Sequence, residues 1–138
     1  LSIVNRSPHR AEELARLVRT AGPVEVTVVP WLGDAAIPGD ADILVNCTSI
    51  GLGDGTARLP VDPRTLRPQL VVADVIPNPP RTAFLTAASA AGATTLDGLG
   101  MLVGQGVLGV GYWTGMDVGT GSARLADAMR KSLEEVFG

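Results

Sequence analysis

The sequence has few of the residues that build disulfide frameworks, metal centres or nucleophilic active sites. Its 138 residues include one cysteine, Cys47, and one histidine, His9. A lone cysteine excludes an internal disulfide, and the single histidine lies in an expected helix cap exposed to solvent, so no metal set can be assembled. Cys47 lacks a histidine partner in any recognisable signature. Neither thiol catalysis nor a Ser/His/Asp set is therefore indicated.

Positive charge and long apolar runs are also scarce. Eleven Lys and Arg against fourteen Asp and Glu give a net charge of −3, which argues against nucleic acid as a partner. The longest apolar stretch, 98–113, contains Gln105 and several glycines and is shorter than the roughly 20 residues that span a bilayer. No signal-peptide pattern opens the chain. We therefore expect a cytoplasmic protein without a membrane segment.

What the chain does have is a regular alternation of apolar strand-length runs and helical patterns. The expected strands are 1–4, 24–29, 43–45, 70–75 and 94–96, and the expected helices are 8–21, 84–91, 98–113 and 122–137, the last with a buried stripe of Leu125, Met129, Leu133 and Val136. Several strands are continuously apolar, which is typical of strands buried on both faces. The pattern predicts one α/β domain over 1–138: a Rossmann-like, doubly wound and mainly parallel sheet with helices on both faces. Because Leu1–Val4 resembles a strand already under way, we expect the first βα unit to be missing.

A cationic segment without carboxylates follows the first expected strand. In Asn5-Arg6-Ser7-Pro8-His9-Arg10, Ser7 is a favourable N-cap and Pro8 a favourable first helical residue. In doubly wound folds an acidic residue at this point binds the ribose of NAD, whereas a basic group accommodates the 2′-phosphate of NADP. Arg6 and Arg10 can bind phosphate and stack on adenine. The segment indicates an NADP site, and a helix cap with solvated arginines is the alternative.

Three further segments place small or polar residues at expected strand ends and on a helix. Residues 46–51 (Asn-Cys-Thr-Ser-Ile-Gly) would let a ligand approach the edge at which open parallel sheets bind, although ordinary turns have the same composition. Asp74 precedes a proline-rich strand exit, and we expect it to accept loop hydrogen bonds rather than act on a ligand. Gln105 suits a polyhydroxylated substrate, and a core glutamine bonded to backbone is the alternative.

Taken in order, these segments resemble the cofactor half of the shikimate/quinate dehydrogenase family. Asn5-Arg6-Ser7 with Arg10 resembles the family's Asn-Arg-Thr/Ser segment, and Asn46-Cys47-Thr48-Ser49 resembles its Asn-Ala-Thr-Ser loop. Residues 97–105 resemble the start of its helix beside the nicotinamide, and Trp113-Thr114-Gly115 the motif that ends this helix. The resemblance covers nearly the whole chain. It implies an NADP-dependent oxidoreductase of the chorismate pathway of aromatic amino acid biosynthesis, or of quinate metabolism.

The resemblance also implies roles for individual residues. It places Gln105 at the substrate and the following residues at the cofactor: Asn5, Arg6, Ser7, Arg10, Cys47, Thr48, Ser49, Ile50, Val75, Gly98 and Met101. It assigns no catalytic residue to this chain, because the family's Lys and Asp pair belongs to an N-terminal substrate domain. The chain is thus expected to be the cofactor-binding part of a two-domain enzyme and inactive alone. Its partners would be that domain and a small cyclic hydroxy acid, with a homodimer left open.

One departure from the family pattern and two other functions stay open. Pro77 stands where the family commonly has a tyrosine whose hydroxyl would touch the carboxylate side of the substrate, which leaves open a different ring substrate, such as an amino-substituted one. The missing Lys and Asp pair leaves open a nucleotide-sensing Rossmann domain without catalysis. A methyltransferase fits less well, because the arginines stand where its ribose-binding acid is expected.

Overall fold

The computed structural model describes residues 1–119 and 122–137 and divides the chain into two compact units. Unit 1 contains Leu1–Ala36 and Pro60–Asp62, and unit 2 contains Ile37–Leu59 and Pro63–Gly138. Both units combine parallel strands with helices, and every strand pair described is parallel. The expected α/β class is confirmed.

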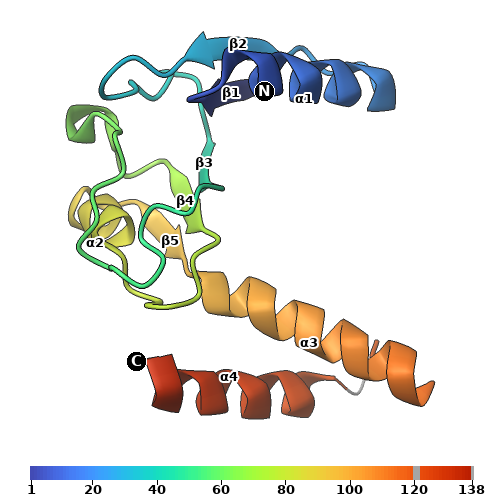
Figure 1. Ribbon diagram of the computed structural model, residues 1–138. Coiled ribbons are helices and arrows are strands. Elements are labelled where there is room, and N and C mark those ends of the chain that lie inside the picture. The colour runs from blue at the N-terminus through green and yellow to red at the C-terminus, as the bar shows by residue number, and fades with distance from the viewer. Residues whose placement is uncertain (120–121, 138) are drawn as a thin grey trace. The chain divides into compact units, whose positions relative to one another are not determined.

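Unit 1 is a strand–helix–strand unit made of β1 (Ser2–Asn5), α1 (Pro8–Ala21) and β2 (Thr27–Pro30) (Figure 1). The strands pair in parallel from Ser2 opposite Thr27 to Asn5 opposite Pro30. Helix α1 packs on both strands through Ala11 and Ala15, which are fully buried. Small residues on this helix face allow a close approach to the strands.

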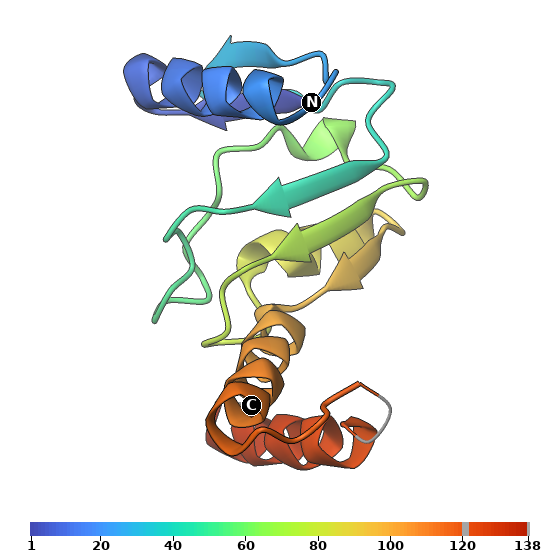
Figure 2. The same cartoon turned by 90° about the vertical axis from the view of Figure 1, so that its right-hand side faces the viewer.

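Unit 2 is built on a three-stranded parallel sheet, β3 (Ile43–Asn46), β4 (Val71–Asp74) and β5 (Thr94–Leu96), in the order β3-β4-β5. The strands point in one direction, with α2 (Ala83–Ala90) behind them in Figure 2. The core of the unit includes Val72 of β4 and Phe84, Leu85 and Ala88 of α2. A short 3-10 helix, η1 (Pro63–Thr65), lies in the connection between β3 and β4.

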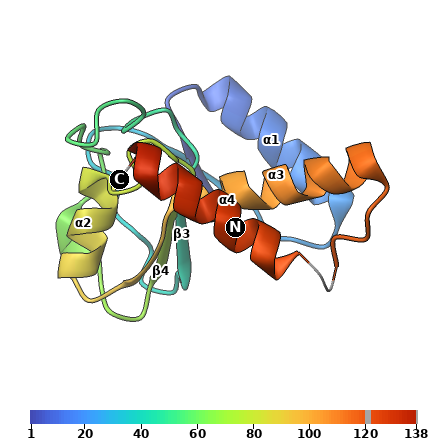
Figure 3. The same ribbon diagram turned by 90° about the horizontal axis from the view of Figure 1, so that it is seen from below.

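Two longer helices complete unit 2. Helix α3 (Gly98–Thr114) follows β5 directly, and α4 (Ala123–Phe137) packs against it (Figure 3). Leu99, Val103 and Val107 form the buried stripe of α3, which ends at Gly115 in the left-handed conformation with φ of 72°.

The structure differs from the sequence expectations in three respects. The strand expected at 24–29 begins only at Thr27, because the register with β1 starts there. The stripe expected to be buried on α4 is half-buried, and Val136 is 72% exposed, because α4 packs on α3 and not into the sheet core. The strands described form a two-stranded and a three-stranded sheet and not a single one, because no ladder joins β1 or β2 to β3.

Candidate functional site

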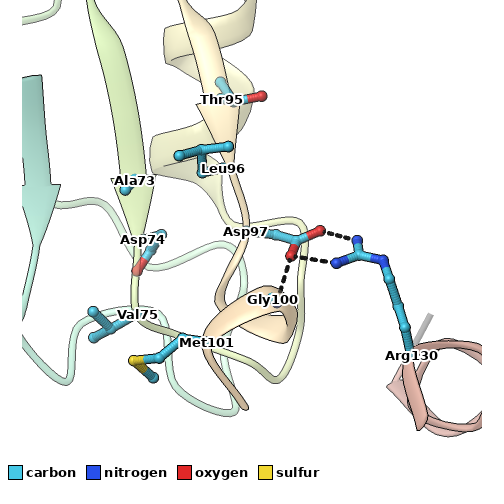
Figure 4. A pocket seen from close by; sticks show the side chains of 9 residues that line it. All are labelled: Ala73, Asp74, Val75, Thr95, Leu96, Asp97, Gly100, Met101 and Arg130. Carbon is cyan, nitrogen blue, oxygen red and sulfur yellow. Dashed lines mark hydrogen bonds and ion pairs between the residues drawn. The ribbon is translucent and has the colours of Figure 1, made fainter. Parts of the chain in front are cut away.

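A pocket of about 460 Å³ opens at the carboxyl ends of β4 and β5 in unit 2 (Figure 4). Ala73, Val75, Leu96 and Met101 supply apolar surface, and Asp74, Asp97 and Arg130 supply charge. The carboxyl edge of a parallel sheet is where open α/β folds bind ligands, because the loops that follow the strands converge there. An apolar pocket with a few fixed charges is suited to a planar ring.

The first turn of α3 forms one wall of this pocket. Asp97 is its N-cap, and Oδ1 accepts hydrogen bonds from the backbone N–H of Leu99 (3.1 Å) and Gly100 (3.3 Å). Gly98 is buried against the exit of β4, where a Cβ atom would lie 2.3 Å from the carbonyl oxygen of Ile76. Only glycine permits this close approach. Because Met101 lies in the first turn of α3, its position depends on the Asp97 cap and on the packing of Gly98 against Ile76.

An ion pair joins α4 to the start of α3. Nη1 of Arg130 donates to Oδ1 of Asp97 at 3.1 Å and Nη2 donates to Oδ2 (Figure 4). Nε of the same side chain donates to Oε1 of Glu134 at 2.8 Å. The hydrogen bond from Arg130 is the main cause that lowers the pKa of Asp97, and Asp97 in turn raises the pKa of Arg130. Both groups are therefore charged at neutral pH, and they neutralise one another at the pocket.

A buried carboxylate organises the exits of β3 and β4. Asp74 is 3% exposed, and it accepts hydrogen bonds from Asn46 Nδ2 (3.0 Å), the N–H of Ile76 (3.1 Å) and Thr82 Oγ1 (2.8 Å). Thr82 is also the N-cap of α2. As expected, Asp74 is satisfied by its surroundings. It ties two loops and a helix end together at the sheet edge.

The loop after β3 is shaped by its own side chains. Asn46 Oδ1 accepts from the N–H (3.0 Å) and hydroxyl (2.8 Å) of Thr48, whose oxygen accepts from the N–H of Ile50 at 3.1 Å. Cys47 and Ser49 are exposed on this loop. The predicted site residues Cys47, Thr48, Ser49 and Ile50 thus share one ordered loop, but they do not line the pocket.

The cationic segment of unit 1 is built as a helix N-terminus. Asn5 Oδ1 accepts from the N–H of Ser7 at 2.9 Å, and Ser7 Oγ accepts from the N–H of Arg10 at 3.4 Å. Arg6, His9 and Arg10 are exposed. Within residues 1–119 and 122–137, the guanidinium groups of Arg6 and Arg10 have no hydrogen-bond or ion-pair partner. Two free cations beside a helix N-terminus are suited to an anion.

The predicted site residues thus lie in three places: at or near the pocket, on the loop after β3, and in the cationic segment of unit 1. Val75 and Met101 line the pocket and Gly98 lies at its edge; Gln105 is exposed on α3, one turn beyond Met101. Sequence reasoning missed Arg130 and the pocket-lining Leu96. For Arg130, the local sequence shows a possible ion pair with Glu134 one helical turn away, but this pattern does not reveal the contact with Asp97.

Two other kinds of site find no support in the part of the chain that the structure describes. It contains no group of three His, Cys, Asp or Glu side chains arranged to hold a metal ion. None of its helices is long and apolar enough to cross a membrane.

Parallel strands, crossover helices and a pocket at their carboxyl edge define this chain as a Rossmann-like domain. No family model matches the chain. The NADP(+)-dependent shikimate dehydrogenase of Rhodospirillum rubrum is 37% identical over 133 residues, which are 96% of this chain and 45% of that protein. Over the part of such enzymes that it spans, the chain is a homologue of the shikimate/quinate dehydrogenases.

Solved structures agree with this assignment. The ligand-free 5-ketofructose reductase of Gluconobacter sp. strain CHM43 is 46% identical, with a TM-score of 0.88 over 99% of this chain and 47% of that one. The quinate dehydrogenase of Corynebacterium glutamicum, solved with NAD, is 29% identical, with a TM-score of 0.80 over 98% of this chain and 46% of that one. The chain spans less than half the length of the relatives that it matches.

Proposed function

We propose that this chain is the NADP-binding part of a two-domain oxidoreductase, with the nicotinamide ring in the pocket beside Met101. The observation that carries the proposal is the pocket itself, which lies at the carboxyl edge of β4 and β5 and has apolar walls from Val75, Leu96 and Met101. Homologues that bear the name NADP-dependent shikimate dehydrogenase support the choice of cofactor. Relatives more than twice as long support the two-domain organisation.

Each unit, taken by itself, has residues that fit one part of the cofactor. In unit 1, the free guanidinium groups of Arg6 and Arg10 would bind the 2′-phosphate, and no carboxylate stands between them to repel it. In unit 2, Val75 and Met101 would hold the ring by apolar contact. When bound, the cofactor supplies hydride chemistry; the chain's own part is to bind and orient it. Gln105, exposed on α3 beyond Met101, would donate and accept hydrogen bonds to the substrate.

The division of the strands into two sheets supports the expectation that a βα unit belongs before β1. In the doubly wound order 3-2-1-4-5-6, the first strand lies between the second and the fourth. Without that strand, a two-stranded and a three-stranded sheet are expected, and these are the two sheets observed. We propose that the remaining part supplies this unit and a substrate domain with the groups that accept the substrate's hydroxyl proton.

The likeness to 5-ketofructose reductase favours a second substrate class for the same chemistry. At 46% identity it exceeds the 37% shared with the Rhodospirillum rubrum enzyme, and Pro77 removes the tyrosine expected beside a substrate carboxylate. The two candidates are a cyclic keto acid such as 3-dehydroshikimate and a ketose such as 5-ketofructose.

One assay separates these candidates. The complete protein that contains this chain is given NADPH with each ketone in turn, and the loss of NADPH absorbance is followed, with NADH as the control. Turnover with either ketone supports the dehydrogenase and identifies its substrate class. NADPH binding without turnover of either ketone would favour a nucleotide-sensing domain, and no binding of NADPH would refute the proposal.

A further inference from the structure

Among the residues that the structure describes, the pocket is lined by the carboxylates of Asp74 and Asp97 and by one cation, Arg130. The charge of Asp74 is spread over three hydrogen-bond donors in a buried network. The charge of Asp97 is different, because its side chain is 26% exposed and its one cationic partner is Arg130. Without Arg130, the pocket would have an uncompensated carboxylate at the start of α3.

Arg130 is held in place from both sides and is not a loose surface side chain. Its guanidinium donates two hydrogen bonds to Asp97, and Nε donates to Glu134 one turn further along α4. The neighbouring Met129 fixes α4 against α3, since its Sδ lies 3.2 Å from where a Cβ atom of Gly106 would be. The packing of the two helices therefore determines where the positive charge lies.

This placement matters because the two forms of a nicotinamide ring differ in charge. The oxidised ring is a cation and the reduced ring is neutral, so a bare carboxylate beside the ring would favour the oxidised form. We propose that Arg130 sets the relative affinity of the site for the two forms: by neutralising Asp97, it shifts binding toward NADPH. The inference rests on the proposed function, because it requires the nicotinamide ring to lie in this pocket.

The test compares the two dissociation constants in the complete protein. NADPH is titrated by its own fluorescence, and NADP⁺ by displacement of NADPH. Arg130→Met should raise the ratio Kd(NADPH)/Kd(NADP⁺) by about three- to tenfold, the size expected for one unit charge several ångströms from a partly solvated site. Arg130→Lys keeps the charge and should stay close to the parent ratio. The double variant Arg130→Met with Asp97→Asn should return toward that ratio.

A purely structural role for Arg130 makes a different prediction. Loss of packing alone would weaken both forms of the cofactor alike and leave the ratio unchanged, and this result would overturn the inference while the proposed function stands. If Arg130→Met does not fold, Asp97→Asn decides the question: it removes the negative charge at the pocket, leaves the guanidinium paired with Glu134, and should lower the ratio below that of the parent protein. A parent protein that binds neither form would refute the proposed function, and the inference with it.

Discussion

Gly98 is the position at which a single methyl group should do most damage to the pocket. An added Cβ would lie 2.3 Å from the carbonyl oxygen of Ile76 and 2.8 Å from the nitrogen of Pro77. Both neighbours are backbone atoms, so no side-chain rotation can relieve the clash. The first turn of α3 must move away from the exit of β4. We therefore expect Gly98→Ala to displace Met101 and to weaken binding of NADPH.

The expected magnitude follows from the packing of the site. Forced overpacking of this kind costs about 1–3 kcal/mol. Gly104→Ala is the matched control, because it lies on the same helix, is exposed, and would have nothing within 4 Å of its new methyl group. Helix propensity alone should make Gly104→Ala more stable by about 0.5–1 kcal/mol. Urea unfolding of the complete protein measures both variants, and NADPH titration measures the pocket. A Gly98→Ala protein as stable as Gly104→Ala would refute this reasoning.

Three more perturbations test other parts of the structure. Thr82→Val removes the hydroxyl that donates to Asp74 and caps α2, and should lower the free energy of unfolding by about 1–3 kcal/mol, whereas Thr82→Ser should stay near the parent value in the same urea titration. The folded-state pKa of Asp97 lies below the ordinary value of 3.8, so its stabilising contribution is present above about pH 4 and is lost as pH falls through the folded pKa; the stability difference between the parent protein and Asp97→Asn should shrink over that window in acid unfolding. Arg6→Asp should lower the ratio of kcat/KM for NADP⁺ over NAD⁺ by about tenfold or more, whereas Arg16→Asp, an exposed change on the helix α1 that follows Arg6, should leave it unchanged.

Most of the fold was predictable because it depends on local patterns. Helix α1 begins at Pro8 after the N-cap Ser7, and α3 begins at Gly98 after Asp97, as capping chemistry requires. Where the expectation failed, the cause lies in the pairing of elements. Residues 24–26 have strand-forming character, but β2 begins only where it meets Ser2 of β1. The depth at which α4 is buried likewise depends on its partner α3, which its own sequence does not specify.

Sequence motifs point to candidate site residues on loops and at strand ends, but they do not reveal the long-range contacts of the pocket. Motifs in the sequence identified Val75 and Met101, which line the pocket. The pairing of Asp97 with Arg130 spans 33 residues and depends on how two helices pack. An arginine on an amphipathic helix gives no sign that it faces a carboxylate and not solvent. The role of Thr82 as a donor to Asp74 was hidden for the same reason, since it arises only when α2 packs on β4.

The choice between substrates depends on Pro77. Its nitrogen carries no hydrogen and its ring has no polar atom, so it cannot donate a hydrogen bond to a substrate carboxylate as a tyrosine hydroxyl could. A hydrogen bond to a charged group contributes about 1.5–3 kcal/mol, which corresponds to roughly a 10- to 100-fold loss for a ring acid that lacks it. A ketose has no carboxylate, so the absence of this hydrogen-bond donor does not weaken its binding. We therefore expect the ratio of kcat/KM for 5-ketofructose over 3-dehydroshikimate to exceed one, and Pro77→Tyr to lower this ratio. A parent protein that prefers the ring acid would show that another donor binds the carboxylate.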